Sequence, residues 1–140
     1  MFQDGMKMSG KLKITLNDKV VQEVDNLVVT SGKEFVASRM VGTSASVMSH
    51  MAVGSGSTAA AAGDTALGSE LGRTTATSSA SGAVVTYSST FAAGTGTGAV
   101  TEAGLFNASS SGDMLCRTVF SVVNKGASDS MTISWLVTVS

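Results

Sequence analysis

The last ten residues of the chain alternate between apolar and polar side chains. The apolar positions are Met131, Ile133, Trp135, Val137 and Val139, and threonine or serine fills most positions between them. A period of two in a run rich in β-branched residues predicts a strand with one buried face. We therefore expect this segment to close a sheet, with the tryptophan inside.

A second alternating segment lies near the N-terminus, over residues 8–16. Asn17-Asp18 has the composition of a tight turn, and residues 19–24 are expected to return as the partner strand of a hairpin. We expect Asp25-Asn26 to end that strand, and the short apolar run 27–30 to be buried.

Only one segment carries convincing helical signals. Ser31 is expected as the N-cap and Glu34 as the residue that reaches back to it, which is the capping-box pattern. Val36 and Met40, four positions apart, would then share one face of a two-turn helix over 35–41.

Further strands are expected in the alternating or apolar runs that lie between turn signals. They are 47–53, 73–78, 83–91, 99–106 and 114–123. In the last of these the pattern directs Met114, Cys116, Thr118, Phe120 and Val122 inward. Residues 54–68 are low-complexity Ala/Gly/Ser/Thr sequence and are expected to form a loop.

About eight strands with regular turn signals predict a mainly β fold. We expect an antiparallel β-sandwich or jelly-roll-like barrel with one short N-terminal helix, forming a single domain over 1–140 with 1–7 as an extended arm. The expected core comprises six residues: Val85, Tyr87, Phe120, Ile133, Trp135 and Val137.

The amino-acid composition argues against several classes of function. Charged residues make up 14% of the 140, with a net charge of −1, so there is no basic field to hold nucleic acid. Proline is absent, and Cys116 is the only cysteine, which excludes an intrachain disulfide. The first residues lack a signal-peptide layout, and no apolar run approaches the ~18 residues of a membrane span. We expect neither a nucleic-acid nor a membrane partner.

Catalytic chemistry would have to use His50, the only histidine, with Asp64, Asp113 or Asp129 as partner. No nucleophile elbow surrounds any serine, and no second histidine or cysteine offers metal-ligand spacing. We therefore predict that the chain is not an enzyme and holds neither a metal nor a cofactor.

Glu102 stands alone as a charge within 99–106. Arg73 and Arg117, each in its own expected strand, are its candidate partners, and a structural ion pair or an interface contact is a better interpretation than catalysis. The glycine-rich run 94–98 lacks the Lys-Ser/Thr of a phosphate-binding loop and is expected to be a turn. Cys116 is expected to be a small buried residue.

Several motifs together resemble small virion structural proteins of tailed bacteriophages. They are MAVGSGST (51–58), TALGSELGR (65–73), FAAGTGTGAVTEAGLFN (91–107), MLCRTVF (114–120), MTISW (131–135), LVVTSG (27–32) and FVASR (35–39). The resemblance covers nearly the whole chain. It implies a virion component made in the host cytoplasm, and it leaves the place in the particle open.

Two placements compete. A capsid decoration, or cement, protein binds the outside of the shell, commonly as a homotrimer, and staples neighbouring copies of the major capsid protein. A tail, baseplate or fibre protein would join other tail proteins instead. The modest length and the lack of a fibrous repeat favour cement. A carbohydrate-binding β-sandwich is a third, distant alternative, weakened because Trp135 and Tyr87 are better used in the core.

Residues 1–10, which include the arm, and the 54–68 loop are the candidate inter-subunit contacts, because both lack the composition to order alone. The candidate residues are Met1, Phe2, Met6, Met8, Ser55, Ser57, Thr58 and Asp64.

Overall fold

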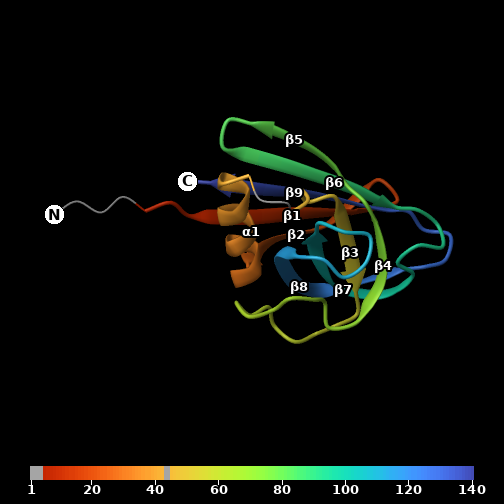
Figure 1. The fold of residues 1–140 in the computed structure, drawn as a ribbon. Helices are drawn as coiled ribbons and strands as arrows, with labels where there is room; N and C mark the ends of the chain where they lie inside the picture. Colours follow the sequence, from red (N-terminus) through yellow and green to blue (C-terminus); the bar gives the residue numbers. More distant parts are fainter. Residues whose placement is uncertain (1–4, 43–44) are drawn as a thin grey trace.

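The computed structural model describes residues 5–42 and 45–140, and in these residues nine strands and one helix are present (Figure 1). The strands are β1 Met8–Leu16, β2 Lys19–Val28, β3 His50–Gly54, β4 Glu70–Thr75, β5 Thr77–Ser81, β6 Val84–Phe91, β7 Gly98–Phe106, β8 Met114–Lys125 and β9 Met131–Val139; the helix is α1 Thr30–Met40. Met1 and Phe2, two of the expected contact residues, lie outside the described residues.

The strands form one antiparallel sheet in the order β4-β3-β7-β8-β2-β1-β9-β6-β5. Its two terminal strands, β4 and β5, are consecutive in the chain and separated only by Ala76, so the sheet curls until its ends approach each other. Ser89 on β6 donates its hydroxyl to the Thr75 carbonyl on β4 (3.0 Å) across this junction. The prediction of a mainly antiparallel β fold with one short helix is confirmed, and the sheet is nearly closed and barrel-like.

The N-terminal hairpin forms as expected. Asn17 and Asp18 adopt φ of +48° and +66°, the left-handed conformations of a two-residue type I′ turn. The expected break at Asp25-Asn26 is wrong. β2 runs on to Val28 and changes partners there: its first part pairs with β1, and Leu27-Val28 pairs with β8. The backbone therefore stays extended because a second strand takes over its hydrogen bonds.

The main core lies inside the curled sheet. Of the six expected core residues, Phe120, Ile133, Trp135 and Val137 are buried, and Trp135 is 0% exposed. On β9, which lies between β1 and β6, the apolar positions from Met131 to Val137 pack into this core, and Val139 at the end of the strand is half-buried. Val85 and Tyr87 are only half-buried. Their strand, β6, is next to the sheet edge, where β5 offers only Ser, Thr and Ala side chains as cover.

One inward assignment in β8 is wrong. Val122 is exposed and Val123 is buried instead. The register explains the change: Val100 pairs with Val123, whereas Glu102 pairs with Val119, so β8 carries extra residues opposite β7. Such a bulge reverses the alternation beyond it.

The helix is present, but its expected cap is wrong, and of the two residues expected to share a face, Val36 packs against the main core and Met40 does not. Val29 is the N-cap and has no polar side chain to cap with. Ser31 lies inside the first turn, where its hydroxyl donates to the Met114 carbonyl on β8 (3.0 Å). Met40 is 77% exposed. The helix instead rests on β8 through Gly32, where an added Cβ would lie 2.1 Å from the Leu115 carbonyl oxygen.

Candidate functional site

A second, smaller apolar layer lies beneath the low-complexity loop. Ala103 and Leu105 of β7 face the main core, while Phe106 belongs to a separate buried cluster with Val29, Ala52 and Met114. Leu67 of the loop packs on this cluster. The loop between β3 and β4 therefore covers the sheet face opposite the main core.

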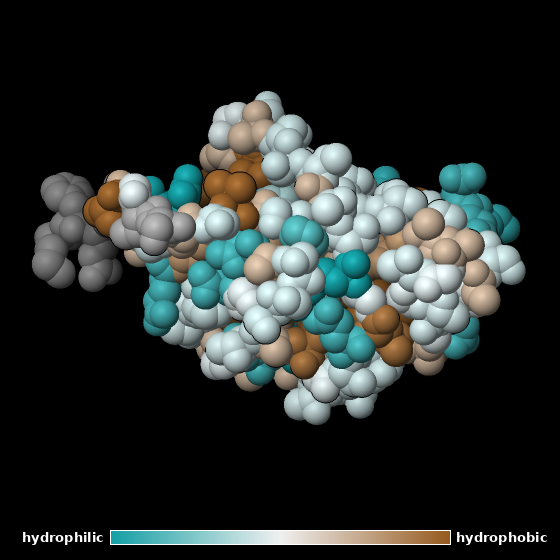
Figure 2. Space-filling model, turned by 45° about the vertical axis from the view of Figure 1, so that its right-hand side comes forward, coloured by the Kyte–Doolittle hydropathy of each residue, from teal (hydrophilic) through white to brown (hydrophobic). Residues whose placement is uncertain are grey.

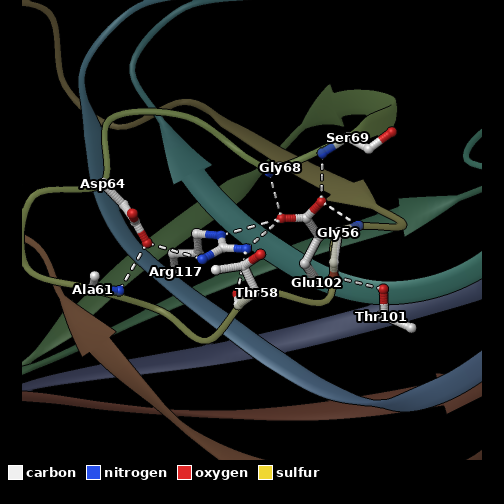
Figure 3. Close-up of polar contacts among 9 residues, drawn as sticks. All are labelled: Gly56, Thr58, Ala61, Asp64, Gly68, Ser69, Thr101, Glu102 and Arg117. Carbon is white, nitrogen blue, oxygen red and sulfur yellow. Dashed lines mark hydrogen bonds and ion pairs between the residues drawn. The ribbon is translucent and has the colours of Figure 1, made fainter.

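Glu102 on β7 anchors this loop (Figure 3). Its carboxylate is 0% exposed and accepts three loop backbone N–H groups, from Gly56 (2.6 Å), Gly68 (2.8 Å) and Ser69 (2.8 Å). Arg117 on β8 adds two more donors, Nε at 3.1 Å and Nη2 at 2.9 Å, both to Oε1. With five donors, this carboxylate has its lone-pair positions filled.

Arg117 carries the connection further along the loop. Its Nη1 forms an ion pair with Asp64 Oδ2 (2.9 Å), and its Nη2 also donates to the Thr58 carbonyl (3.0 Å). Asp64 in turn accepts the Ala61 N–H (2.8 Å). We call Glu102, Arg117 and Asp64, with the loop atoms they bind, the loop clasp.

The small residues of the loop make the clasp possible. A Cβ on Gly56 would lie 2.3 Å from Glu102 Oε2, so only glycine lets this backbone N–H approach the carboxylate. Thr101, the neighbour of Glu102, donates its hydroxyl to the Gly56 carbonyl (2.7 Å) and fixes the same turn from its other side. The low-complexity composition therefore serves close backbone contact.

The environment keeps both clasp carboxylates ionised. Burial raises the pKa of Glu102, but the N–H groups of Gly68, Ser69 and Gly56 and the guanidinium of Arg117 outweigh it, so the net pKa is lowered. The Ala61 N–H lowers the pKa of Asp64, assisted by Arg117 and opposed by partial burial. A buried carboxylate held ionised and saturated with donors is not available as a general base.

The expected pairing of Glu102 with Arg117 is present, and the alternative pairing with Arg73 is wrong. Arg73 binds Glu70 instead (2.7 Å) and lies over the Phe106 ring, 3.9 Å from its centroid. Two further donations from Arg73, to the carbonyls of Ala108 and Ser111 (both 2.9 Å), tie down the loop after β7.

The 54–68 loop, expected to become ordered by lying on a neighbouring subunit, is bound to its own sheet by the clasp. Of its expected contact residues, Ser55, Ser57 and Thr58 remain exposed, while Asp64 is half-buried in the clasp. Of the candidates near the N-terminus, Met6 is 72% exposed, and Met8 packs against the main core as part of β1.

His50 has no catalytic partners in the described residues. Ser49 Oγ lies 2.8 Å from its Nδ1. The three candidate carboxylates bind elsewhere: Asp64 contacts Arg117, Asp113 accepts from Asn107, and Asp129 accepts from Asn17. The Ser–His contact thus lacks the carboxylate that would orient the imidazole for catalysis.

None of the protein-family models, curated proteins or solved structures compared with the chain matches it. Within 5–42 and 45–140, no group of three or more His, Cys, Asp or Glu side chains is arranged to hold a metal ion. In the same residues, no helix has the length and apolar character needed to cross a membrane. The candidate functional site is therefore defined by its own geometry, which is that of a loop anchor.

Proposed function

We propose that the chain is a structural protein of a tailed-bacteriophage virion, and specifically a decoration protein that binds the outside of the capsid and stabilises it. The proposal rests first on the sequence motifs that resemble such proteins. It rests second on how the chain uses its buried charges.

The loop clasp is the observation that carries the proposal. Buried ionic groups are costly to desolvate, and enzymes place them where they can act on a substrate. Here the buried pair Glu102–Arg117 binds backbone groups of the chain itself and fixes a surface loop of small residues. A scaffold that holds its loops in one shape suits a protein that presents a fixed surface to other subunits.

The composition of the protein surface also suits contacts with other subunits. Much of the face drawn in Figure 2 is pale, and the hydrophilic and hydrophobic residues on it form small separate areas. Small, weakly polar side chains allow close backbone approach between subunits at little cost in side-chain entropy. Many such contacts, repeated by symmetry over a shell, add up to firm attachment.

The carbohydrate-binding alternative loses support. Sugar-binding β-sandwiches need exposed aromatic rings, but among the described residues no Phe, Tyr or Trp is one of the exposed large hydrophobic side chains. Trp135 is wholly buried and Tyr87 packs against the core.

Particles assembled without the chain test the proposal. We expect closed shells that lose their DNA at a lower temperature, and we expect purified chain to bind these shells and restore the heat resistance. Shells of unchanged heat resistance, to which the chain does not bind, would contradict the decoration assignment. Absence of tails or of host attachment in the same particles would support the tail, baseplate or fibre alternative.

A further inference from the structure

The sheet has two terminal strands, of which β4 is partly buried and β5 is exposed along its whole length. Strand β5 pairs with β6 on one side and is the last strand in the sheet order, so within the described residues no strand lies on its other side. In Figure 1 it lies at the top of the molecule, and all five of its residues are exposed.

The register shows which backbone groups point outward. β5 and β6 are joined by the two-residue turn Gly82-Ala83, with φ of +59° at Gly82, so Ser81 and Val84 form the hydrogen-bonded pair next to the turn. Alternation along an antiparallel ladder then directs the N–H and C=O groups of Ser78 and Ala80 to the open edge. Each β5 strand presents two donors and two acceptors there.

The open edge of β5 has none of the sequence features that prevent a second strand from pairing with it. Proteins protect open edges with charged side chains, proline or bulges. The stretch 74–101, which contains all of β5 and β6, has no Asp, Glu, Lys or Arg, and the chain has no proline. The β5–β6 register is also free of irregularities. An identical edge would therefore meet β5 without charge repulsion, proline or a bulge in its way.

We propose that β5 is a self-association edge, at which two copies of this chain pair antiparallel about a two-fold axis through Ser79. In this register Ser78 of one copy lies opposite Ala80 of the other, and their outward groups form four hydrogen bonds. The two Ser79 residues face each other as a non-hydrogen-bonded pair. A second copy is the occupant that fits, because the edge is neutral and self-complementary in this arrangement. The inference does not depend on the proposed function.

Disulfide trapping tests this register directly. A non-hydrogen-bonded antiparallel pair has Cα atoms about 4.5 Å apart, within the range that a disulfide bridges. The native Cys116 is fully buried and does not compete. In the full-length chain we expect Ser79→Cys to form a disulfide-linked dimer at least about tenfold faster than Ser121→Cys, an exposed control on β8, because pairing raises the local thiol concentration. Equal rates would overturn the proposal.

Sedimentation of the full-length chain supplies a second readout. We expect a monomer–dimer equilibrium that Ser79→Lys shifts to monomer, because it places two ammonium groups opposite each other on the axis. Ser121→Lys, which changes the net charge equally, should leave the equilibrium unchanged. A wild-type chain that stays monomeric up to about 1 mM, or an oligomer that both lysine variants weaken equally, would contradict edge pairing. An oligomer that neither variant affects would show that another surface associates.

Discussion

Glu102 Oε1 and Arg117 Nη2 lie 2.9 Å apart on adjacent strands, with the carboxylate at 0% and the guanidinium side chain at 3% exposure. This pair connects the sheet to the longest low-complexity segment of the chain. Its contacts on the loop side are mostly with backbone atoms, so the pair determines the shape of the loop without needing any particular loop side chain other than that of Asp64.

Removing the charge of Glu102 should destabilise the protein strongly. Glu102→Gln would leave Arg117 buried without its main partner and would turn amide protons toward N–H groups of the loop. We expect a loss of about 3–5 kcal/mol in the free energy of unfolding, measured by chemical denaturation. Glu70→Gln is the control, because the Glu70 side chain is 37% exposed and Arg73 keeps its bonds to the carbonyls of Ala108 and Ser111; it should cost less than about 1 kcal/mol. Equal losses of stability in the two variants would show that the clasp stabilises the fold no more than a surface ion pair does.

The clasp should also make stability depend on acid. The pKa of Glu102 is lowered from its ordinary 4.5 and that of Asp64 from 3.8, so the folded state binds protons less readily than the unfolded chain. Their stabilising contributions are therefore full above these values and are lost as pH falls through the lowered folded-state values. We expect the unfolding free energy of the wild type to decline in this range, and more steeply than that of Glu102→Gln. Parallel pH profiles for the two proteins would rule out Glu102 as the source.

Two glycines of the same loop provide a matched pair. A Cβ on Gly56 would meet Glu102 Oε2 at 2.3 Å, whereas a Cβ on Gly63 would meet nothing within 4 Å. Gly56→Ala should cost about 1–3 kcal/mol and raise amide exchange over 55–69. Gly63→Ala should be neutral or stabilise by up to about 1 kcal/mol. The reverse order would place the anchor of the loop elsewhere.

Trp135 tests the main core. Because its side chain is wholly buried, Trp135→Ala should cost about 3–5 kcal/mol. Val20→Ala, at a residue 56% exposed on β2, should change stability by less than about 0.5 kcal/mol. Thermal or chemical unfolding followed by far-UV circular dichroism measures both. A cost below ~1 kcal/mol for the tryptophan would show that the core does not depend on it.

Much of the sheet could be predicted because alternation and turn chemistry are local signals. The bounds 8–16 and 131–139 match β1 and β9, and Asn17-Asp18 forms the expected turn. The failures arise where a distant segment competes. The helix begins before Ser31, whose hydroxyl donates to the Met114 carbonyl of β8, and β8 extends β2 beyond Asn26.

The candidate site was only partly predictable for the same reason. Glu102 stands out as a charge in an uncharged stretch, which is how its pairing with Arg117 could be expected. The loop N–H groups of Gly56, Gly68 and Ser69 leave no signature in the sequence, because every residue except proline has one. Only the fold brings them to one carboxylate.

The number and position of copies in the purified particle test the proposed function most directly. Quantitative protein analysis of virions, combined with imaging of the particle, gives both. We expect many copies, in a simple ratio to the major capsid protein and on the outside of the shell. A few copies confined to the tail, or none in the particle, would contradict the decoration assignment.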